Sequence, residues 1–394
     1  MALSAWMGSS QVLDGREAGS EAALRAVEQV GRNPIIMGFV IASHSLPLQH
    51  VLGGAATQVG DAPLFGYSTL AELSKEGVHQ RSVQVIVLAG TDVTAKVDWW
   101  ADFSTNSQKC CGEMLQTIQP APGSGALLTI ADGLSGKPDL LCDCLTQSGV
   151  YAAGWLSGAE LRHTRTYQAG GRQAGSGGLA AAYIQGQVSM GVGCDHGWQP
   201  TGRYFEVTRS KGNFIRTLDK LPVSEAFSQL FGFRALEWSQ PPLNELVRLY
   251  PFGIENNKDQ PMLVRSPIKM EVDGSLRVHV EIPEHTKVHV MVGSVDQFSQ
   301  AVERATAQAL RNLKGARPVL GLVLPDVSFR MLLDTQPGIE MQSVHNILGK
   351  EIPIIGGYSF GQMTPLWTQE SHESTVQFRT GEVLVVILGE RANG

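Results

Sequence analysis

Gly66-Tyr67-Ser68-Thr69-Leu70-Ala71-Glu72 recurs in altered form as Gly357-Tyr358-Ser359-Phe360-Gly361-Gln362, and this repeat decides how the chain is organised. Both segments begin with Gly-Tyr-Ser, and the two tripeptides lie 291 residues apart (357 − 66). When the second segment is shifted by one residue, Glu72 falls opposite Gln362. A segment that recurs with its polar residue in register indicates two related units within the chain.

The residues around each segment predict the same succession of elements: strand, helix, strand, helix, strand, strand. Apolar residues recur at helical spacing in two stretches of each unit, and short apolar runs lie between these stretches. The first unit comprises strands at about 5–12, 35–41, 63–73 and 83–89 and helices at 17–30 and 46–59; the last comprises strands at 288–294, 318–324, 353–363 and 382–388 and helices at 295–312 and 338–348. The predicted fold class is therefore α/β of the mixed α+β kind, with mixed sheets flanked by helices.

The middle of the chain, about residues 105–280, shows no similarity to the repeat and is interpreted as unrelated to it. Its Gly-rich stretch, 170–178, has neither the Gly-Lys-Ser/Thr ending of a P-loop nor a G-x-G-x-x-G motif that enters a helix. We interpret this stretch as a surface loop. The expected organisation is two intertwined halves with an internal pseudo-duplication, 1–220 and 221–394.

Composition excludes several classes of function. The chain has 394 residues, 17% of them charged, and a net charge of −6 with no block of like charges, so neither nucleic acid nor a membrane surface is expected as a partner. There is no long apolar window and no basic leader, which predicts a cytoplasmic protein. Among the five cysteines, neither Cys110-Cys111 nor Cys142-x-Cys144 has the spacing of a zinc or redox motif, so reduced thiols and no bound metal are expected.

Three segments, in this order along the chain, resemble motifs of the FIST family, the F-box and intracellular signal transduction domains. Residues 66–72 are similar to a Gly-Cys-Ser-Thr-x-Gly-Glu-like motif of the amino-terminal half of that family. Residues 193–200 are similar to the middle of the same half, and residues 353–363 resemble a Pro-x-x-Gly-Phe-Tyr-x-Gly-Glu-like motif of the carboxy-terminal half. The resemblance covers nearly the whole chain.

The resemblance implies a sensory protein that binds a small, amino-acid-like metabolite and signals through a partner such as a histidine kinase. Some proteins of similar layout bind haem and sense nitric oxide, and a haem-based sensor is the first alternative; His196, next to Trp198, is then the candidate iron ligand. The chain departs from the family motifs at Tyr67, Ala71 and Gln362, which replace Cys, Gly and Glu. These departures imply a changed ligand preference or a degenerate site.

Polar residues after each Gly-Tyr segment are the candidate ligand contacts, because ligand sites favour a few convergent polar groups at an interface between domains. A carboxylate such as Glu72 suits a ligand ammonium, and Arg330 suits a carboxylate. The candidate set is Ser68, Thr69, Glu72, Arg330, Tyr358, Ser359 and Gln362. Each of them can instead satisfy buried backbone groups at a turn, and that alternative stays open.

A second alternative is a serine hydrolase. Gly357-Tyr358-Ser359-Phe360-Gly361 fits the G-x-S-x-G nucleophile elbow, in which a strand precedes the serine and a helix follows it. The residues after Gly361 do not begin a convincing helix, and Glu370 and His372 are the acid and base that the remaining chain offers. We therefore expect a binding protein without catalytic residues rather than an enzyme.

Overall fold

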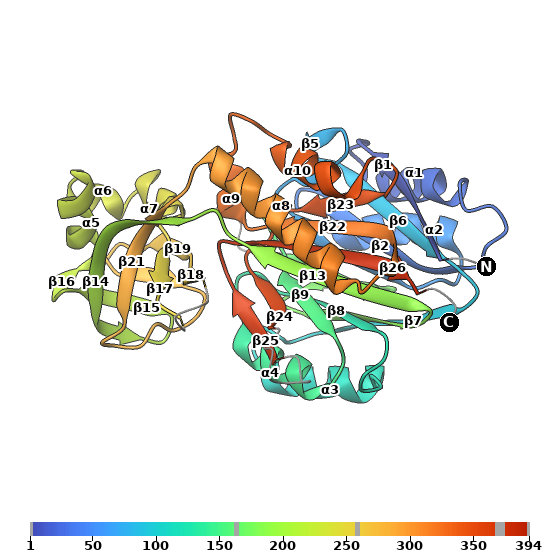
Figure 1. Cartoon of the computed structure of the whole chain (residues 1–394), viewed down its shortest axis with the longest axis horizontal. Helices are drawn as coiled ribbons and strands as arrows, with labels where there is room; N and C mark the ends of the chain where they lie inside the picture. The colour runs from blue at the N-terminus through green and yellow to red at the C-terminus, as the bar shows by residue number, and fades with distance from the viewer. Residues whose placement is uncertain (1–2, 161–164, 257–260, 367–374, 392–394) are drawn as a thin grey trace.

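A computed structural model describes residues 3–160, 165–256, 261–366 and 375–391 (Figure 1). Three six-stranded sheets and their helices form one body, and a further sheet forms a lobe at the left of Figure 1. Parallel and antiparallel pairs occur together in each sheet of the body, which confirms the mixed α+β fold class. No helix among the described residues has the length and apolar character needed to cross a membrane.

The first unit has the predicted order of elements. Along the chain it contains β1 (Ser4–Ser10), α1 (Gly15–Val27), β2 (Ile35–Ser43), α2 (Leu48–Val59), β3 (Leu64–Thr69), β4 (Glu72–Ser74), β5 (Gly77–His79) and β6 (Val83–Ala89). Asp14 caps α1 through its side chain, which accepts a hydrogen bond from the backbone N–H of Glu17. The run predicted as one strand over 63–73 is divided between β3 and β4, and these two strands belong to different sheets.

The last unit also follows the predicted order, except at its first strand. It contains β13 (Val188–Asp195), α8 (Val295–Asn312), β22 (Arg317–Pro325), α9 (Val327–Leu332), α10 (Ile339–Leu348), β23 (Ile354–Gly357), β24 (Gln362–Leu366), β25 (Thr375–Arg379) and β26 (Val383–Glu390). The prediction that 288–294 opens this unit is wrong. That stretch forms β21 (Lys287–Val292) of the lobe, whereas β13 pairs with β26 as β1 pairs with β6.

The middle of the chain contains a third copy of the same unit, so the prediction of an unrelated middle is also wrong. Its elements are β7 (Val93–Trp100), α3 (Ser107–Ile118), β8 (Ala126–Ala131), α4 (Pro138–Gln147), β9 (Ala152–Leu156), β10 (Tyr167–Gly171), β11 (Gln173–Ser176) and β12 (Leu179–Gly186). The Gly-rich stretch is the hairpin β10–β11 rather than a loop. Trp155 occupies the position of Tyr67, so this copy has no Gly-Tyr-Ser tripeptide that would mark it in the sequence.

Each unit donates one hairpin to the sheet of another unit. Hairpin β4–β5 joins β23 of the last unit, β10–β11 joins β3 of the first, and β24–β25 joins β9 of the middle unit. These hairpins open at equivalent polar residues, Glu72, Gln168 and Gln362, and the exchange forms a closed ring of three.

The register of this ring confirms the alignment of the repeat in which the second segment is shifted by one residue. Gly66 and Gly356 are equivalent, because each pairs with a valine on the neighbouring parallel strand of its unit: Gly66 with Val40, and Gly356 with Val323. Their separation is 290 residues (356 − 66), which is also the separation of Glu72 and Gln362 (362 − 72). The two Gly-Tyr-Ser tripeptides are therefore displaced by one residue, and the shifted alignment is the structural one.

One apolar core fills the space that the three sheets share, and it takes side chains from all three units, including Phe39, Trp155 and Leu322. Three further clusters lie under the outer helices: α1 and α2, α3 and α4, and α8 to α10. Aromatic rings join the units inside the central core, where the rings of Tyr67 and Trp155 lie 5.6 Å apart, edge to face. The body is thus held together by burial of apolar side chains at the centre as well as by strand exchange.

The lobe is inserted between β13 and α8. Its elements are β14 (Gln199–Lys211), β15 (Phe214–Leu218), β16 (Leu221–Pro222), α5 (Val223–Phe231), α6 (Ala235–Trp238), α7 (Leu243–Leu246), η1 (Val247–Leu249), β17 (Phe252–Ile254), β18 (Leu263–Arg265), β19 (Pro267–Met270), β20 (Leu276–Val278) and β21. The lobe has its own core around Phe227 and Trp238. The boundary predicted between 220 and 221 falls within this sheet, next to β16, and the division into two domains stays a prediction.

Buried cationic side chains of the lobe reach the body. The Arg248 guanidinium lies over the Phe360 ring, 5.3 Å from its centroid, and Arg265 Nη1 donates a hydrogen bond to the Phe378 carbonyl oxygen at 3.0 Å. Both arginines are less than a tenth exposed. The lobe is therefore fixed to the body beside β25.

Candidate functional site

The structure brings together six of the seven predicted ligand contacts. Ser68, Thr69 and Glu72 lie where β3 passes into β4, and Tyr358, Ser359 and Gln362 lie where β23 passes into β24. The two groups meet because the first unit gives its hairpin to the last: Glu72 pairs with Gly357, and Thr69 Oγ1 donates a hydrogen bond to the Tyr358 carbonyl oxygen at 2.9 Å. All six residues are at most 1% exposed.

Most of these six side chains have protein partners. Ser68 Oγ donates to the Gly158 carbonyl oxygen at 3.1 Å and accepts from the Tyr167 N–H at 2.9 Å. Gln362 Nε2 donates to Ser359 Oγ at 2.9 Å, and the Tyr358 hydroxyl donates to Glu340 Oε1 at 2.5 Å. The side chains therefore join the units to one another, and their contact with a ligand stays a prediction.

Arg330 is the seventh predicted contact, and its positive charge acts on the nearby Tyr358 and Glu340. It lies on α9, its side chain is 18% exposed, and its Nη1 pairs with Asp334 Oδ1 at 2.6 Å across one turn of chain. Because Asp334 is largely exposed, this ion pair contributes little to stability. A role for Arg330 in binding a carboxylate stays a prediction.

Glu72 and Gln362 each have one buried side-chain oxygen without a partner, and in Glu72 that oxygen belongs to a carboxyl group. Glu72 Oε2 accepts hydrogen bonds from the N–H and the hydroxyl of Ser82, at 3.2 and 2.6 Å, but its buried Oε1 has no partner. Burial raises the pKa of the Glu72 carboxyl to about 8, against the lowering effect of the Ser82 hydrogen bonds. The neutral acid is consequently the form that fits this site at neutral pH.

The raised pKa of Glu72 predicts that stability depends on pH. Between about pH 4.5 and pH 8 the folded protein keeps a proton that the unfolded chain has released. The contribution of this carboxyl to the free energy of unfolding therefore falls as pH rises through that window, with a limiting slope of about 1.4 kcal/mol per pH unit. Glu72→Gln keeps an acceptor for Ser82 and removes the titration.

Urea unfolding of wild type and Glu72→Gln across this pH window tests the prediction. The variant should gain stability relative to wild type as pH rises, whereas exposed Glu76→Gln should follow wild type. A difference between wild type and Glu72→Gln that stays constant with pH would contradict the raised pKa.

Ser359 does not occupy a nucleophile elbow. Its side chain is fully buried, its Oγ lies 3.4 Å from the Pro325 carbonyl oxygen, and strand β24 follows it where an elbow has a helix. Glu370 and His372 lie outside the described residues. The local geometry thus gives no support to the serine hydrolase alternative.

His196 lies in the turn between β13 and β14, and both nitrogens of its ring are buried without a partner. A haem needs a cavity for a flat macrocycle beside its axial ligand. Its neighbour Gly197 packs closely against Phe298, and His196 does not line the cavities near Arg317, Phe214 or Arg379, so a haem at His196 stays a prediction.

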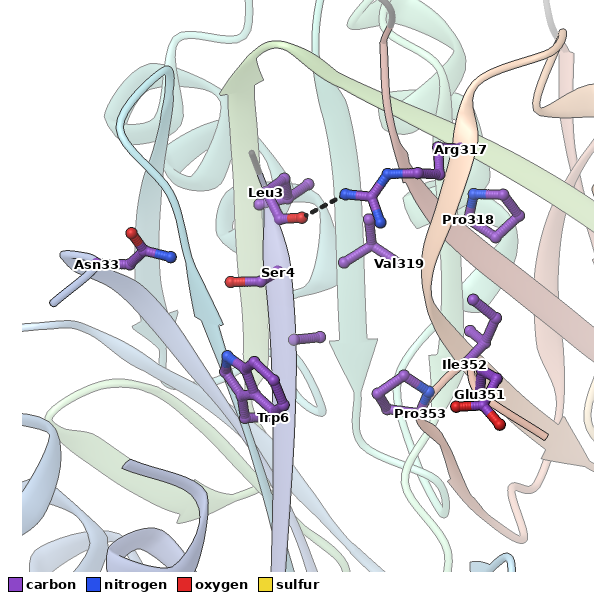
Figure 2. Close-up of a pocket in the computed structure, with 11 residues that line it drawn as sticks. Leu3, Ser4, Trp6, Asn33, Arg317, Pro318, Val319, Glu351, Ile352 and Pro353 are labelled. Carbon is purple, nitrogen blue, oxygen red and sulfur yellow. Dashed lines mark hydrogen bonds between the residues drawn. The ribbon is translucent and has the colours of Figure 1, made fainter. Parts of the chain in front are cut away.

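A groove of about 530 Å³ lies in the body between β1 and the starts of β22 and β23 (Figure 2). Apolar side chains of Trp6, Pro318 and Pro353 form much of its wall. Arg317 points across the groove, and its Nη2 donates to the Leu3 carbonyl oxygen at 3.1 Å and to Glu390 at 2.8 Å. The Arg317 guanidinium therefore already has protein partners, and it links β1 to the last unit.

The second cavity, of about 210 Å³, lies where the last unit, the donated hairpin β24–β25 and the lobe meet. Its polar lining comes from Cys194 on β13, Gln308 on α8, Thr364 and Arg379 on the hairpin, and Asn256 of the lobe. The remaining lining residues are Val192, Gly193, Pro261, Pro365 and Leu366. Thr364 and Arg379 share one face of the hairpin with Gln362, because Gln362 pairs directly with Arg379. Gln362, one of the predicted contact residues, therefore lies next to this cavity without lining it.

Arg379 gives this cavity its charge. Its Nη1 lies 3.1 Å from Glu382 Oε1, and its buried Nε has no partner. The Glu382 carboxylate raises the pKa of Arg379, so the guanidinium stays charged although it is mostly buried. Cys194 Sγ donates to Glu382 Oε2 at 2.8 Å, and burial raises the pKa of this thiol, which keeps it protonated.

The sequence analysis did not find Arg379. It lies 17 residues beyond Gln362 (379 − 362), in a strand without a motif, and the two meet only through the pairing of β24 with β25. The sequence signal was the alternation of Thr375, Gln377 and Arg379 with Val376 and Phe378, which predicts one polar and one apolar face. A guanidinium with a free N–H beside a cavity is suited to bind a carboxylate.

The arrangement of sheets and helices places the chain in the class of α+β proteins with mixed sheets flanked by helices. Two family models match it, the FIST N domain over residues 36–221 and the FIST C domain over residues 225–365. The chain belongs to the FIST family, whose domains are associated with signal transduction and small-ligand sensing.

No curated protein matches the chain. Among solved structures, one described as "Cyanuric acid hydrolase: evolutionary innovation by structural concatenation" aligns with 99% of this chain and 100% of its own, at 8% identity and a TM-score of 0.32. A likeness at this level carries no argument about the chemistry of the chain.

Proposed function

We propose that this FIST-family protein senses a small molecule that carries a carboxylate, and that Arg379 binds this carboxylate in the cavity between β13, α8 and hairpin β24–β25. The observation that supports the proposal is that Arg379 lines this cavity and that its buried Nε, a donor on a charged group, has no partner. An unsatisfied buried donor on a charged group is costly, and a bound anion relieves that cost.

The other polar groups of the cavity suit an amino-acid-like ligand. Gln308 and Thr364 line the same space, and their side-chain oxygens can accept hydrogen bonds from a ligand ammonium. The volume of about 210 Å³ admits a molecule of amino-acid size rather than a nucleotide or a macrocycle.

The place of the cavity suits signalling. Asn256 and Pro261 of the lobe form part of its wall, and body residues form the rest. A ligand held between them stabilises one arrangement of lobe and body if its affinity for the two arrangements differs. A partner in the cytoplasm, such as a histidine kinase, then detects that arrangement.

A thermal-shift screen tests the proposal with amino acids and small mono- and dicarboxylates, each beside its uncharged amide. A ligand at about 100 times its dissociation constant adds about 2.7 kcal/mol, so a carboxylate that binds should raise the midpoint by a few degrees while its amide does not.

Arg379→Lys is the matched variant. It keeps the charge beside Glu382 but loses the planar fork, so affinity for the carboxylate should fall about tenfold or more. Ser4→Ala, in the other groove of the body, should bind as wild type does. Equal shifts for acids and amides, or equal affinity in Arg379→Lys, would overturn the assignment of Arg379.

A further inference from the structure

Side chains of helix α8 cover the outer edge of strand β13. This strand is the end strand of its sheet, so one row of its backbone N–H and C=O groups faces away from β26. Asn312 Nδ2 donates to the Val192 carbonyl oxygen at 2.7 Å, and one helical turn earlier Gln308 Oε1 accepts from the Cys194 N–H at 3.0 Å. The two amides therefore take opposite roles toward the same strand edge.

The bond to Cys194 fixes the orientation of the Gln308 amide. A backbone N–H is a donor only, so the amide atom that meets it is the oxygen, and Nε2 keeps its N–H groups for another acceptor. Nε2 donates to no group in the described part of the chain. Because Gln308 is half-buried and lines the cavity at Arg379, the donor that it offers to that cavity is a neutral amide N–H.

Two donors of different kinds thus line one cavity. Cys194 lies between them, since its N–H meets Gln308 and its thiol meets Glu382, the carboxylate that pairs with Arg379. Arg379 is the only charged side chain among the described residues that line the cavity. A second carboxylate on a ligand would consequently be buried without a cation, which is costly, whereas a neutral carbonyl oxygen can accept from the Gln308 amide.

We propose that the ligand of this cavity carries a neutral amide at the end opposite its carboxylate, and that Gln308 Nε2 donates to the oxygen of that amide. The inference rests on the carboxylate site proposed for Arg379 and names the class of ligand within it, a carboxylic acid of amino-acid size with a terminal carboxamide. Gln308 is then the residue that determines specificity. Its donor role uses Nε2, and the second lone pair of Oε1 stays available to a ligand ammonium.

A set of amino acids with side chains of equal length tests the inference on the wild-type chain. Glutamine, glutamate, norleucine and ornithine share the carboxylate and the ammonium and differ at the end of the side chain. Isothermal titration calorimetry should give glutamine a dissociation constant about tenfold below that of norleucine, which leaves the Gln308 N–H unpaired. Glutamate and ornithine should also bind more weakly than glutamine. Asparagine and aspartate repeat the comparison with a side chain one carbon shorter.

Gln308→Glu is the matched variant. It replaces the amide nitrogen by an oxygen of similar size, and the other carboxylate oxygen can still accept from the Cys194 N–H. The site then offers a charged acceptor instead of a neutral donor, so ornithine should bind about tenfold more tightly than glutamine. Gln300→Glu makes the same substitution at an exposed position of the same helix and should keep the wild-type order.

The outcomes separate this inference from the carboxylate site itself. Equal affinity for glutamine, glutamate and norleucine, with binding that is lost in Arg379→Lys, would overturn the role of Gln308 and leave the carboxylate site standing. The same holds if Gln308→Glu keeps the wild-type preference, or if another carboxylate binds at Arg379 while glutamine and asparagine do not. Binding that Arg379→Lys leaves unchanged would overturn the carboxylate site, and this inference with it.

Discussion

Gly356→Ala is expected to lower the free energy of unfolding by about 3 kcal/mol, a large fraction of the stability of a typical protein. A Cβ at this position would lie 1.9 Å from the Val323 carbonyl oxygen on the neighbouring parallel strand. That oxygen belongs to the backbone of β22, so no side-chain rotation relieves the clash. Gly66 of the first unit has the same crowding, because a Cβ added there would lie 2.4 Å from the Val40 carbonyl oxygen.

Urea unfolding at neutral pH measures the effect, and Gly112→Ala is its matched control. Gly112 lies inside α3 with nothing within 4 Å of an added Cβ. The same substitution there should raise the free energy of unfolding by about 0.5–1 kcal/mol, because alanine restricts the unfolded chain and favours a helix. If Gly356→Ala were as stable as wild type, the close approach of β22 and β23 would be wrong.

Arg379→Met is expected to destabilise the protein by about 3 kcal/mol, because it leaves the Glu382 carboxylate buried without its ion-pair partner. Glu382 is fully buried, and Arg379 is its ion-pair partner at 3.1 Å. Arg265 also interacts electrostatically with Glu382, which places the expected loss at the lower end of the range for a broken buried pair.

The double variant Arg379→Met/Glu382→Leu distinguishes a lost charge pair from lost packing. It removes both charges, so it should recover most of the stability that the single variant loses. Chemical unfolding of both variants beside wild type gives the comparison. A double variant as unstable as Arg379→Met would show that the side-chain volume of Arg379, and not its charge, holds this region.

Local elements were predictable from the sequence wherever a periodic pattern decided them. The helix expected over 295–312 is α8 with the same bounds, because its apolar residues recur at helical spacing and Ser294 caps its first turn. The strand expected over 83–89 is likewise β6. Both predictions rest on information that lies within the segment itself.

Strand pairing was not predictable in this way. The alternating pattern of β24 is satisfied equally by any partner strand, and its pairing with β9 of the middle unit is a long-range choice. For the same reason the sequence analysis missed the hairpin β10–β11 and assigned β21 to the wrong unit. The wall of the cavity at Arg379 depends on such pairings, and so does the meeting of the Ser68–Glu72 and Tyr358–Gln362 segments, which the donated hairpin β4–β5 brings about.

The ring of donated hairpins has a consequence for how the chain folds as it is synthesised. The sheet of the middle unit contains β7, β8, β9 and β12, yet it closes only when β24 and β25 arrive about 180 residues later. Until then the edge of β9 has no partner strand. The sheet of the last unit is likewise incomplete until β26 has been synthesised. The sheets of the middle and last units are therefore complete only after β24 to β26 have left the ribosome, whereas the sheet of the first unit needs no strand beyond β11. Until then the open strand edges are sites at which the growing chain can aggregate.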